Sequence, residues 1–80
     1  MSRLPLISGR EAVRKFVKLG YRAVRQRGSH IRLIHPSDAS RKPLTIPDHN
    51  EVGKGLLHKL IRDAGISLEE FFDLLEYSDL

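Results

Sequence analysis

The stretch YRAVRQRGSHIRLIH, residues 21–35, decides the fold of this 80-residue chain. Gly28-Ser29 divides it into two runs in which apolar and polar side chains alternate, and a Gly-Ser pair is a turn signal. We predict a half-buried strand over Tyr21–Arg27 and a second strand over His30–His35, with side chains pointing alternately to the two faces of a sheet. The stretch therefore predicts an antiparallel β-hairpin that turns at Gly28-Ser29.

Upstream of the hairpin, the sequence predicts a helix over residues 9–19. Ser8 followed by Glu11 is a capping box, which opens helices. Apolar residues recur at helical spacing up to Gly20, a residue that commonly ends helices. The basic residues of this segment are expected on the opposite face of the helix: Arg10, Arg14, Lys15 and Lys18.

Downstream of the hairpin, the sequence predicts a polar loop over residues 36–42 and a short third strand over residues 43–46. Prolines bound this strand on both sides, which favours the edge of a sheet because proline cannot donate to the ladder. Apolar residues at helical spacing then mark a second helix over residues 52–64, closed by Gly65. A capping box that begins at Ser67 opens a third, short helix.

The predicted order of elements is α-β-β-β-α-α in one domain over residues 1–80, with its core at about residues 6–75. Two helices can cover one face of a three-stranded antiparallel sheet and leave the other face in water. An α-β-β-β-α layout is that of the double-stranded-RNA-binding domain. We therefore predict an α+β fold of that kind, with helices on one face of the sheet and a short extra C-terminal helix.

Composition limits the chemistry and the location of the protein. The chain contains no cysteine, which excludes disulfides, thiolate chemistry and cysteine-bearing zinc sites. No apolar run approaches the ~20 residues that span a bilayer, and the apolar part of residues 1–10 is too short for a signal peptide. We therefore expect a cytoplasmic protein.

Charge is divided unevenly along the chain. The formal net charge is +4, with +8 in residues 1–50 and −4 in residues 51–80. The first part is expected to attract a polyanion such as RNA, although ordinary solvated charge is the alternative. The acidic third helix either is simply solvated or contacts a basic protein partner, and its composition does not decide between the two.

His30 is the candidate for catalysis. A histidine accepts and donates protons near neutral pH, and Arg25, Arg27 and Arg32 surround this one with positive charge. RNA carries its own nucleophile, the 2′-hydroxyl, so a protein needs only to move protons and stabilise the phosphorane charge. On these grounds alone, a polar residue at the end of a strand is the more common interpretation of His30.

Lys54 is a second kind of candidate. It falls in the first turn of the second helix, where free N–H groups and the helix dipole favour anions. A phosphate contact and a solvated lysine are equally compatible with this position. The candidate RNA-binding residues are therefore Arg25, Arg27, Gly28, Ser29, Arg32 and Lys54.

The remaining histidines do not indicate a metal site. His35 is expected at a strand end, His49 in a loop and His58 on the polar side of the second helix. None of them is paired at a spacing such as HxxxH, and a zinc site needs three or four converging ligands. We therefore expect neither a metal nor another cofactor.

Several segments, in order, resemble the HicA-type (YcfA-like) messenger-RNA interferase toxins of toxin–antitoxin systems. The resemblance covers about residues 6–72, and a lone Gly-Ser-His would be weak evidence without the ordered set. The matching segments are Ser8-Gly9-Arg10-Glu11, Leu19-Gly20-Tyr21, Val24-Arg25-Gln26-Arg27-Gly28-Ser29-His30, Thr45-Ile46-Pro47-Asp48-His49, Lys54-Gly55 and the run from Leu60 to Ser67.

The resemblance implies a fold like that of the double-stranded-RNA-binding domain and ribosome-independent endonucleolytic cleavage of mRNA. It also implies that the catalytic histidine of the family falls on His30, and that a HicB-type antitoxin covers the site. One departure is visible, because the family commonly has threonine where this chain has Leu56, which puts a hydroxyl contact there in doubt. The alternatives are a non-catalytic RNA-binding module, an inactive relative of the toxins, or a domain whose basic face binds an acidic protein.

Overall fold

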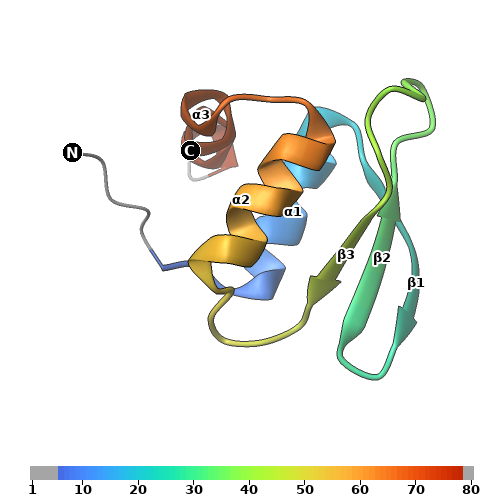
Figure 1. Cartoon of the computed structure of the whole chain (residues 1–80), viewed down its shortest axis with the longest axis vertical. Coiled ribbons are helices and arrows are strands. Elements are labelled where there is room, and N and C mark those ends of the chain that lie inside the picture. Colours follow the sequence, from blue (N-terminus) through green and yellow to red (C-terminus); the bar gives the residue numbers. More distant parts are fainter. Residues whose placement is uncertain (1–5, 79–80) are drawn as a thin grey trace.

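The computed structural model describes residues 6–78, with side chains to residue 74, and it has the predicted order of elements (Figure 1). Residues 1–5 and 79–80 of the predicted domain lie outside the described part. The elements are α1 (Gly9–Leu19), β1 (Arg22–Arg27), β2 (His30–Ile34), β3 (Leu44–Pro47), α2 (Lys54–Ala64) and α3 (Leu68–Ser78).

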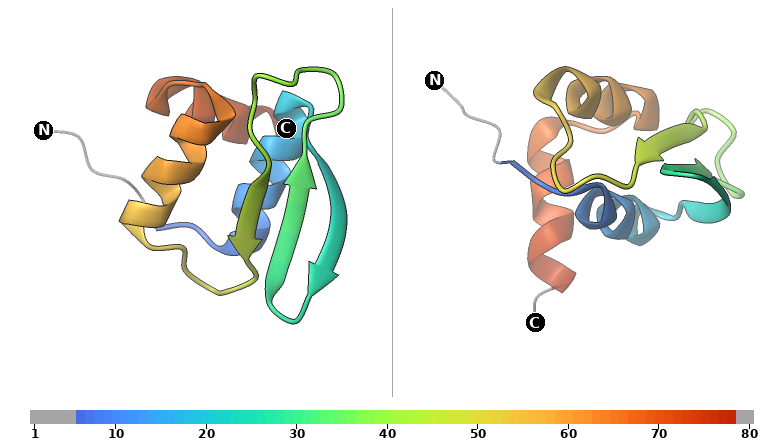
Figure 2. Two further views of the ribbon diagram at one scale, coloured as in Figure 1. Left: turned by 45° about the vertical axis from the view of Figure 1, so that its right-hand side comes forward. Right: turned by 90° about the horizontal axis from the view of Figure 1, so that it is seen from below.

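The three strands form one antiparallel sheet in the order β1-β2-β3. Both α1 and α2 lie on the same side of this sheet, and α3 packs on α1 on the side of the helices away from the sheet (Figure 2). The sheet therefore has an inner face against the helices and an outer face without helices. This arrangement confirms the predicted α+β fold, and β3 lies at a sheet edge as its flanking prolines predicted.

The core lies between the helices and the inner face of the sheet. Alternation along β2 and β3 sends four side chains inward, and each is at most 8% exposed: Ile31, Leu33, Leu44 and Ile46. The helices contribute residues at helical spacing: Ala12, Phe16, Leu57, Leu60, Ile61, Ala64 and Phe71. The predicted alternation of β2 is therefore correct, and it leaves His30 on the outer face.

The predicted bounds of α1 and the predicted end of α2 are confirmed because local signals set them, whereas α2 begins at Lys54 rather than at residue 52. Ser8 Oγ accepts the Glu11 N–H at 3.1 Å, and the Ser8 N–H donates to Glu11 Oε1 at 2.8 Å. Gly20 follows α1 in the left-handed conformation, with φ of 115°. Ser67 and Glu70 repeat the capping box before α3, with hydrogen bonds of 2.8 and 3.0 Å.

The prediction of a half-buried first strand is wrong. All six residues of β1 are exposed, and Tyr21, which is 3% exposed, lies just before the strand. β1 is the edge strand on the far side of β2 from β3, and the buried side chains of the sheet come from β2 and β3. A bulge between Ala23 and Arg25 further disturbs the alternation that the sequence pattern assumes.

The expectation that Lys15 lies on the solvated face of α1 is also wrong. Lys15 is only 1% exposed, because α3 packs on the side of α1 that carries this residue. Lys15 Nζ lies 3.5 Å from the Phe71 carbonyl oxygen, and 4.7 and 5.0 Å from the ring centres of Phe71 and Phe72. Aromatic faces attract cations, so these rings and the carbonyl partly replace water around the ammonium group.

Candidate functional site

The β1–β2 turn is short and held from both sides. Gly28 has φ of 58°, and no atom lies within 4 Å of where its Cβ would be. The Gln26 side-chain amide donates to the Gly28 carbonyl at 3.1 Å, and the Ser29 carbonyl accepts the N–H of Asp48 at 2.6 Å. These contacts tie the turn to the segment that follows β3.

Asp48 carries a second contact that reaches the first helix. Arg10 donates from Nε and Nη2 to the two carboxylate oxygens of Asp48, at 3.0 and 3.1 Å. The hydrogen bond from Arg10 and its charge, helped by the Gln26 amide, lower the pKa of Asp48 below its ordinary value. Asp48 therefore stays ionised and joins α1 to the hairpin turn.

The outer face of the sheet has a hollow of about 190 Å³ beside the turn. We call it the arginine hollow, and the residues that line it are Arg25, Arg27, His30, Arg32 and Thr45. Cross-strand pairing explains the cluster, because directly opposed residues share a face of the sheet. The pairs are Arg27 with His30, Arg25 with Arg32, and Arg32 with Thr45.

His30 is the first residue of β2 and is exposed to solvent. It lies between Arg27 on β1 and Pro47 on β3. Three guanidinium groups line the same hollow, and guanidinium is the side-chain group best suited to bind phosphate through paired hydrogen bonds. The arrangement places a group able to transfer protons where a phosphodiester can bind.

The structure brings most of the candidate residues together but leaves one apart. Four predicted side chains line the arginine hollow, and Gly28 and Ser29 form the turn at its end. Lys54 is exposed at the start of α2, on the helix-covered side of the sheet (Figure 2), and it does not line the hollow. Gly53 caps α2 without a side-chain hydrogen bond.

Two features of the site were missed in the sequence analysis. Thr45 Oγ1 accepts a hydrogen bond of 2.9 Å from Arg32 Nη1, which orients that guanidinium beside His30. Side chains alternate along the third strand, so Thr45 points to the opposite face from Leu44 and Ile46. Together with the pairing of this strand with β2, that alternation would have placed Thr45 on the outer face. The pair of Arg10 and Asp48 had no such signal, because it joins residues far apart in the sequence.

The other histidines lie away from the arginine hollow. His35 Nε2 is 3.0 Å from the Leu19 carbonyl oxygen, and its ring packs edge-on against Tyr21. His49 and His58 are exposed, in a loop and on α2. Within residues 6–78, no three side chains of His, Cys, Asp or Glu are grouped as metal ligands.

Comparison with known protein families places this chain in one class of proteins, the toxins of bacterial toxin–antitoxin systems. The family described as "HicA toxin of bacterial toxin-antitoxin" matches residues 9–66. Because this match covers more than half of the chain, the protein belongs to the HicA toxin family. Membership implies an antitoxin partner and an RNA target.

No curated protein matches the chain. Among the helices of residues 6–78, none combines the length and apolar character that crossing a membrane requires.

Proposed function

We propose that this protein is an endoribonuclease toxin that cleaves mRNA without the ribosome or a metal ion, with His30 as its catalytic residue. The observation that carries the proposal is the arginine hollow, which combines one exposed histidine with three arginines on an open sheet face. Family membership supports the same activity, since it implies an RNA target.

The reaction needs only the groups in this hollow and the RNA itself. The ribose 2′-hydroxyl attacks the adjacent phosphorus, the new 2′-O–P bond forms, and the bond from phosphorus to the 5′-oxygen breaks. His30 takes the proton from the 2′-hydroxyl or gives one to the departing 5′-oxygen, and solvent water exchanges the other proton. The products are a 2′,3′-cyclic phosphate and a 5′-hydroxyl, and one positioned acid or base accounts for about 10²–10⁴-fold of the rate.

The arginines act on the phosphate. Arg25, Arg27 and Arg32 bind the phosphodiester and stabilise the charge that develops on the phosphorane. Thr45 holds the Arg32 guanidinium in place through its 2.9 Å hydrogen bond. Gly28 and Ser29 let the RNA backbone approach the turn, since no side-chain bulk lies over Gly28.

Inhibition follows from the exposure of the site. The arginine hollow lies on a face of the sheet that no helix covers, so a protein bound there would exclude RNA. We propose that the antitoxin is of the HicB type and that it presents acidic side chains to this basic face.

The decisive experiment compares His30→Ala with His58→Ala, a matched change of an exposed histidine on α2. We expect the wild type and His58→Ala to cleave a purified mRNA in EDTA and to arrest growth, whereas His30→Ala, folded by circular dichroism, does neither. Loss of wild-type cleavage on chelation would contradict the metal-free reaction. Wild-type binding of RNA without cleavage would favour the non-catalytic RNA-binding module instead.

A further inference from the structure

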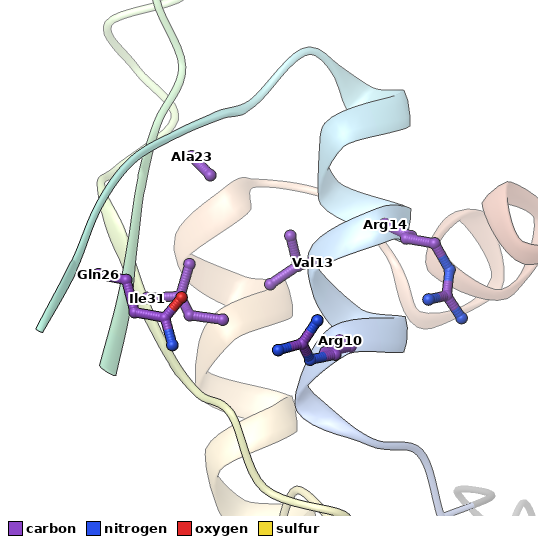
Figure 3. Close-up of a pocket in the computed structure, with 6 residues that line it drawn as sticks. All are labelled: Arg10, Val13, Arg14, Ala23, Gln26 and Ile31. Atoms are coloured by element: carbon purple, nitrogen blue, oxygen red, sulfur yellow. The ribbon is translucent and has the colours of Figure 1, made fainter. Parts of the chain in front are cut away.

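A second concave surface lies on the opposite face of the same hairpin. We call it the edge groove; it has a volume of about 300 Å³ between α1 and β1 (Figure 3). The residues that line it are Arg10, Val13, Arg14, Ala23, Gln26 and Ile31. Its volume is at the lower end of the range for small-ligand sites, which suits a group no larger than one nucleotide.

The bulge in β1 keeps the edge groove open. In a regular ladder, Val24 would lie opposite Leu33 and would project inward toward α1. The bulge places Ala23 opposite Leu33 instead and leaves Val24 48% exposed. A methyl group therefore stands where an isopropyl group would fill the space.

The walls of the edge groove are polar, and the arginine that points into the groove is already paired with a carboxylate. In Figure 3 the Arg10 guanidinium and the Gln26 amide point into the space between α1 and the strands, whereas Arg14 points away from the strands. The Asp48 carboxylate already neutralises Arg10 through two hydrogen bonds, yet 73% of the Arg10 side chain is exposed. Arg10 therefore offers a fixed, flat surface rather than a free charge.

A neutral, planar, polar group fits these walls better than a carboxylate does. Nucleobases stack on guanidinium planes and on apolar side chains, and amide groups bond to base edges. The Gln26 amide nitrogen already donates to the Gly28 carbonyl, so the amide oxygen is the atom that would accept from a base edge. The floor is apolar, formed by Val13, Ala23 and Ile31. An acidic peptide would instead need an unpaired cation that points into the groove, whereas Arg10 is paired with Asp48 and Arg14 points away from the strands.

We propose that the edge groove receives one base of the RNA whose phosphate lies in the arginine hollow. Neighbouring residues of the hairpin line the two surfaces: Gln26 and Ile31 face the groove, while Arg27 and His30 face the hollow. Since β1 is an edge strand of the sheet, an RNA chain can pass over this edge from the groove to the hollow. The inference rests on the proposed function, because it takes RNA as the ligand of the hollow.

The test uses His30→Ala protein, so that the RNA stays intact, and a fluorescent oligoribonucleotide in which each base in turn is replaced by an abasic ribose. We expect one abasic position to weaken binding about tenfold or more, which is the effect of losing one stacked base. Adding Ala23→Leu should fill the groove, weaken binding of the intact RNA by a similar factor, and abolish the abasic penalty. Ala23→Val should fill the groove in part and have a smaller effect on both measurements. Valine is favoured in strands, so this variant also keeps β1 intact.

Ala39→Leu is the matched control, because it is the same change at an exposed residue in the β2–β3 loop, and it should leave both measurements unchanged. Circular dichroism and urea midpoints establish that the variants are folded. The groove assignment would be overturned if the protein binds and cleaves RNA but Ala23→Leu does not change the penalty of any abasic position. The proposed function would then stay intact. The groove assignment would also be overturned if Ala23→Leu weakens binding of the antitoxin but not binding of RNA. Failure of the wild type to bind or cleave RNA would overturn both.

Discussion

Arg10 and Asp48 join α1 to the segment that follows β3 through two parallel hydrogen bonds of 3.0 and 3.1 Å. The N–H of Asp48 donates in turn to the carbonyl of Ser29, the residue before His30. Asp48 thus fixes the guanidinium of the edge groove through its carboxylate, and the turn beside the arginine hollow through its backbone N–H. The position of Arg10 is therefore coupled to the ionisation of Asp48.

Acid should destabilise the fold through this residue. The hydrogen bond from Arg10 holds the pKa of Asp48 below its ordinary value of 3.8, so the unfolded chain binds the proton more readily than the folded one. The stabilisation is fully present above pH about 5 and is lost as the pH falls through the lowered pKa. We expect the urea midpoint to fall below pH about 4, and less steeply in Asp48→Asn.

Glu51→Gln is the control for this pH dependence. Glu51 is exposed, and within residues 6–78 no hydrogen bond or ion pair holds its carboxylate. Its removal should leave the pH profile parallel to that of the wild type. Identical profiles for Asp48→Asn and the wild type would show that the pair with Arg10 does not persist in solution.

Gly9 should not tolerate a side chain. A Cβ at this position would collide with the carbonyl oxygen of Pro47, since the start of α1 lies directly against the end of β3. The Gly9 N–H also donates to the His49 carbonyl at 2.8 Å, which prevents the helix from moving away. We expect Gly9→Ala to lower the free energy of unfolding by about 1–3 kcal/mol, measured by urea titration.

Gly55→Ala makes the same substitution as Gly9→Ala, at a position where there is room for the added methyl group. Apart from the neighbouring backbone of α2 itself, no atom of the described residues lies within 4 Å of its Cβ position, and Gly55 is in the first turn of α2. Alanine there should raise the free energy of unfolding by about 0.4–1 kcal/mol, because it restricts the unfolded chain. Equal effects of the two substitutions would contradict the close contact at Gly9.

Lys15 should behave as a core residue. Its side chain fills the space between α1 and α3 and contacts the rings of Phe71 and Phe72. We expect Lys15→Ala to cost about 2–4 kcal/mol of unfolding free energy, as truncation of a buried side chain does. Lys18→Ala, at an exposed position in the last turn of α1, should change it by no more than about 0.5 kcal/mol.

The contrast between Lys15 and His30 shows what the sequence could predict. Capping boxes, helix-ending glycines and strand alternation are local signals, and they gave the element order, the hairpin and the outer-face position of His30. The burial of Lys15 depends on where α3 packs, and the exposure of β1 depends on its place at the sheet edge. Neither is encoded within one turn or one strand, so periodicity alone assigned both to the wrong environment.

The same reasoning applies to the candidate site. The arginines and the histidine of the arginine hollow were predictable because they are paired across one hairpin, whereas Thr45 comes from β3 and was missed. The edge groove was not predictable, because it needs a bulge at Val24 and a helix that begins with Arg10, and no local pattern joins these. Lys54 was grouped with the arginines by charge, and the fold puts it on the other side of the sheet.

The salt dependence of RNA binding should distinguish Arg27 from Lys54. Each phosphate contact on a single strand releases counterions and adds about 0.7 to the slope of log affinity against log salt. We expect Arg27→Ala, in the arginine hollow, to weaken binding to a short oligoribonucleotide and to reduce that slope by about 0.7. Arg62→Ala removes the same charge from α2 and should change neither. Lys54→Ala should reduce the slope only with RNA long enough to reach from the hollow to the start of α2. An equal reduction by Lys54→Ala with the short oligoribonucleotide would contradict the separation of the two basic sites.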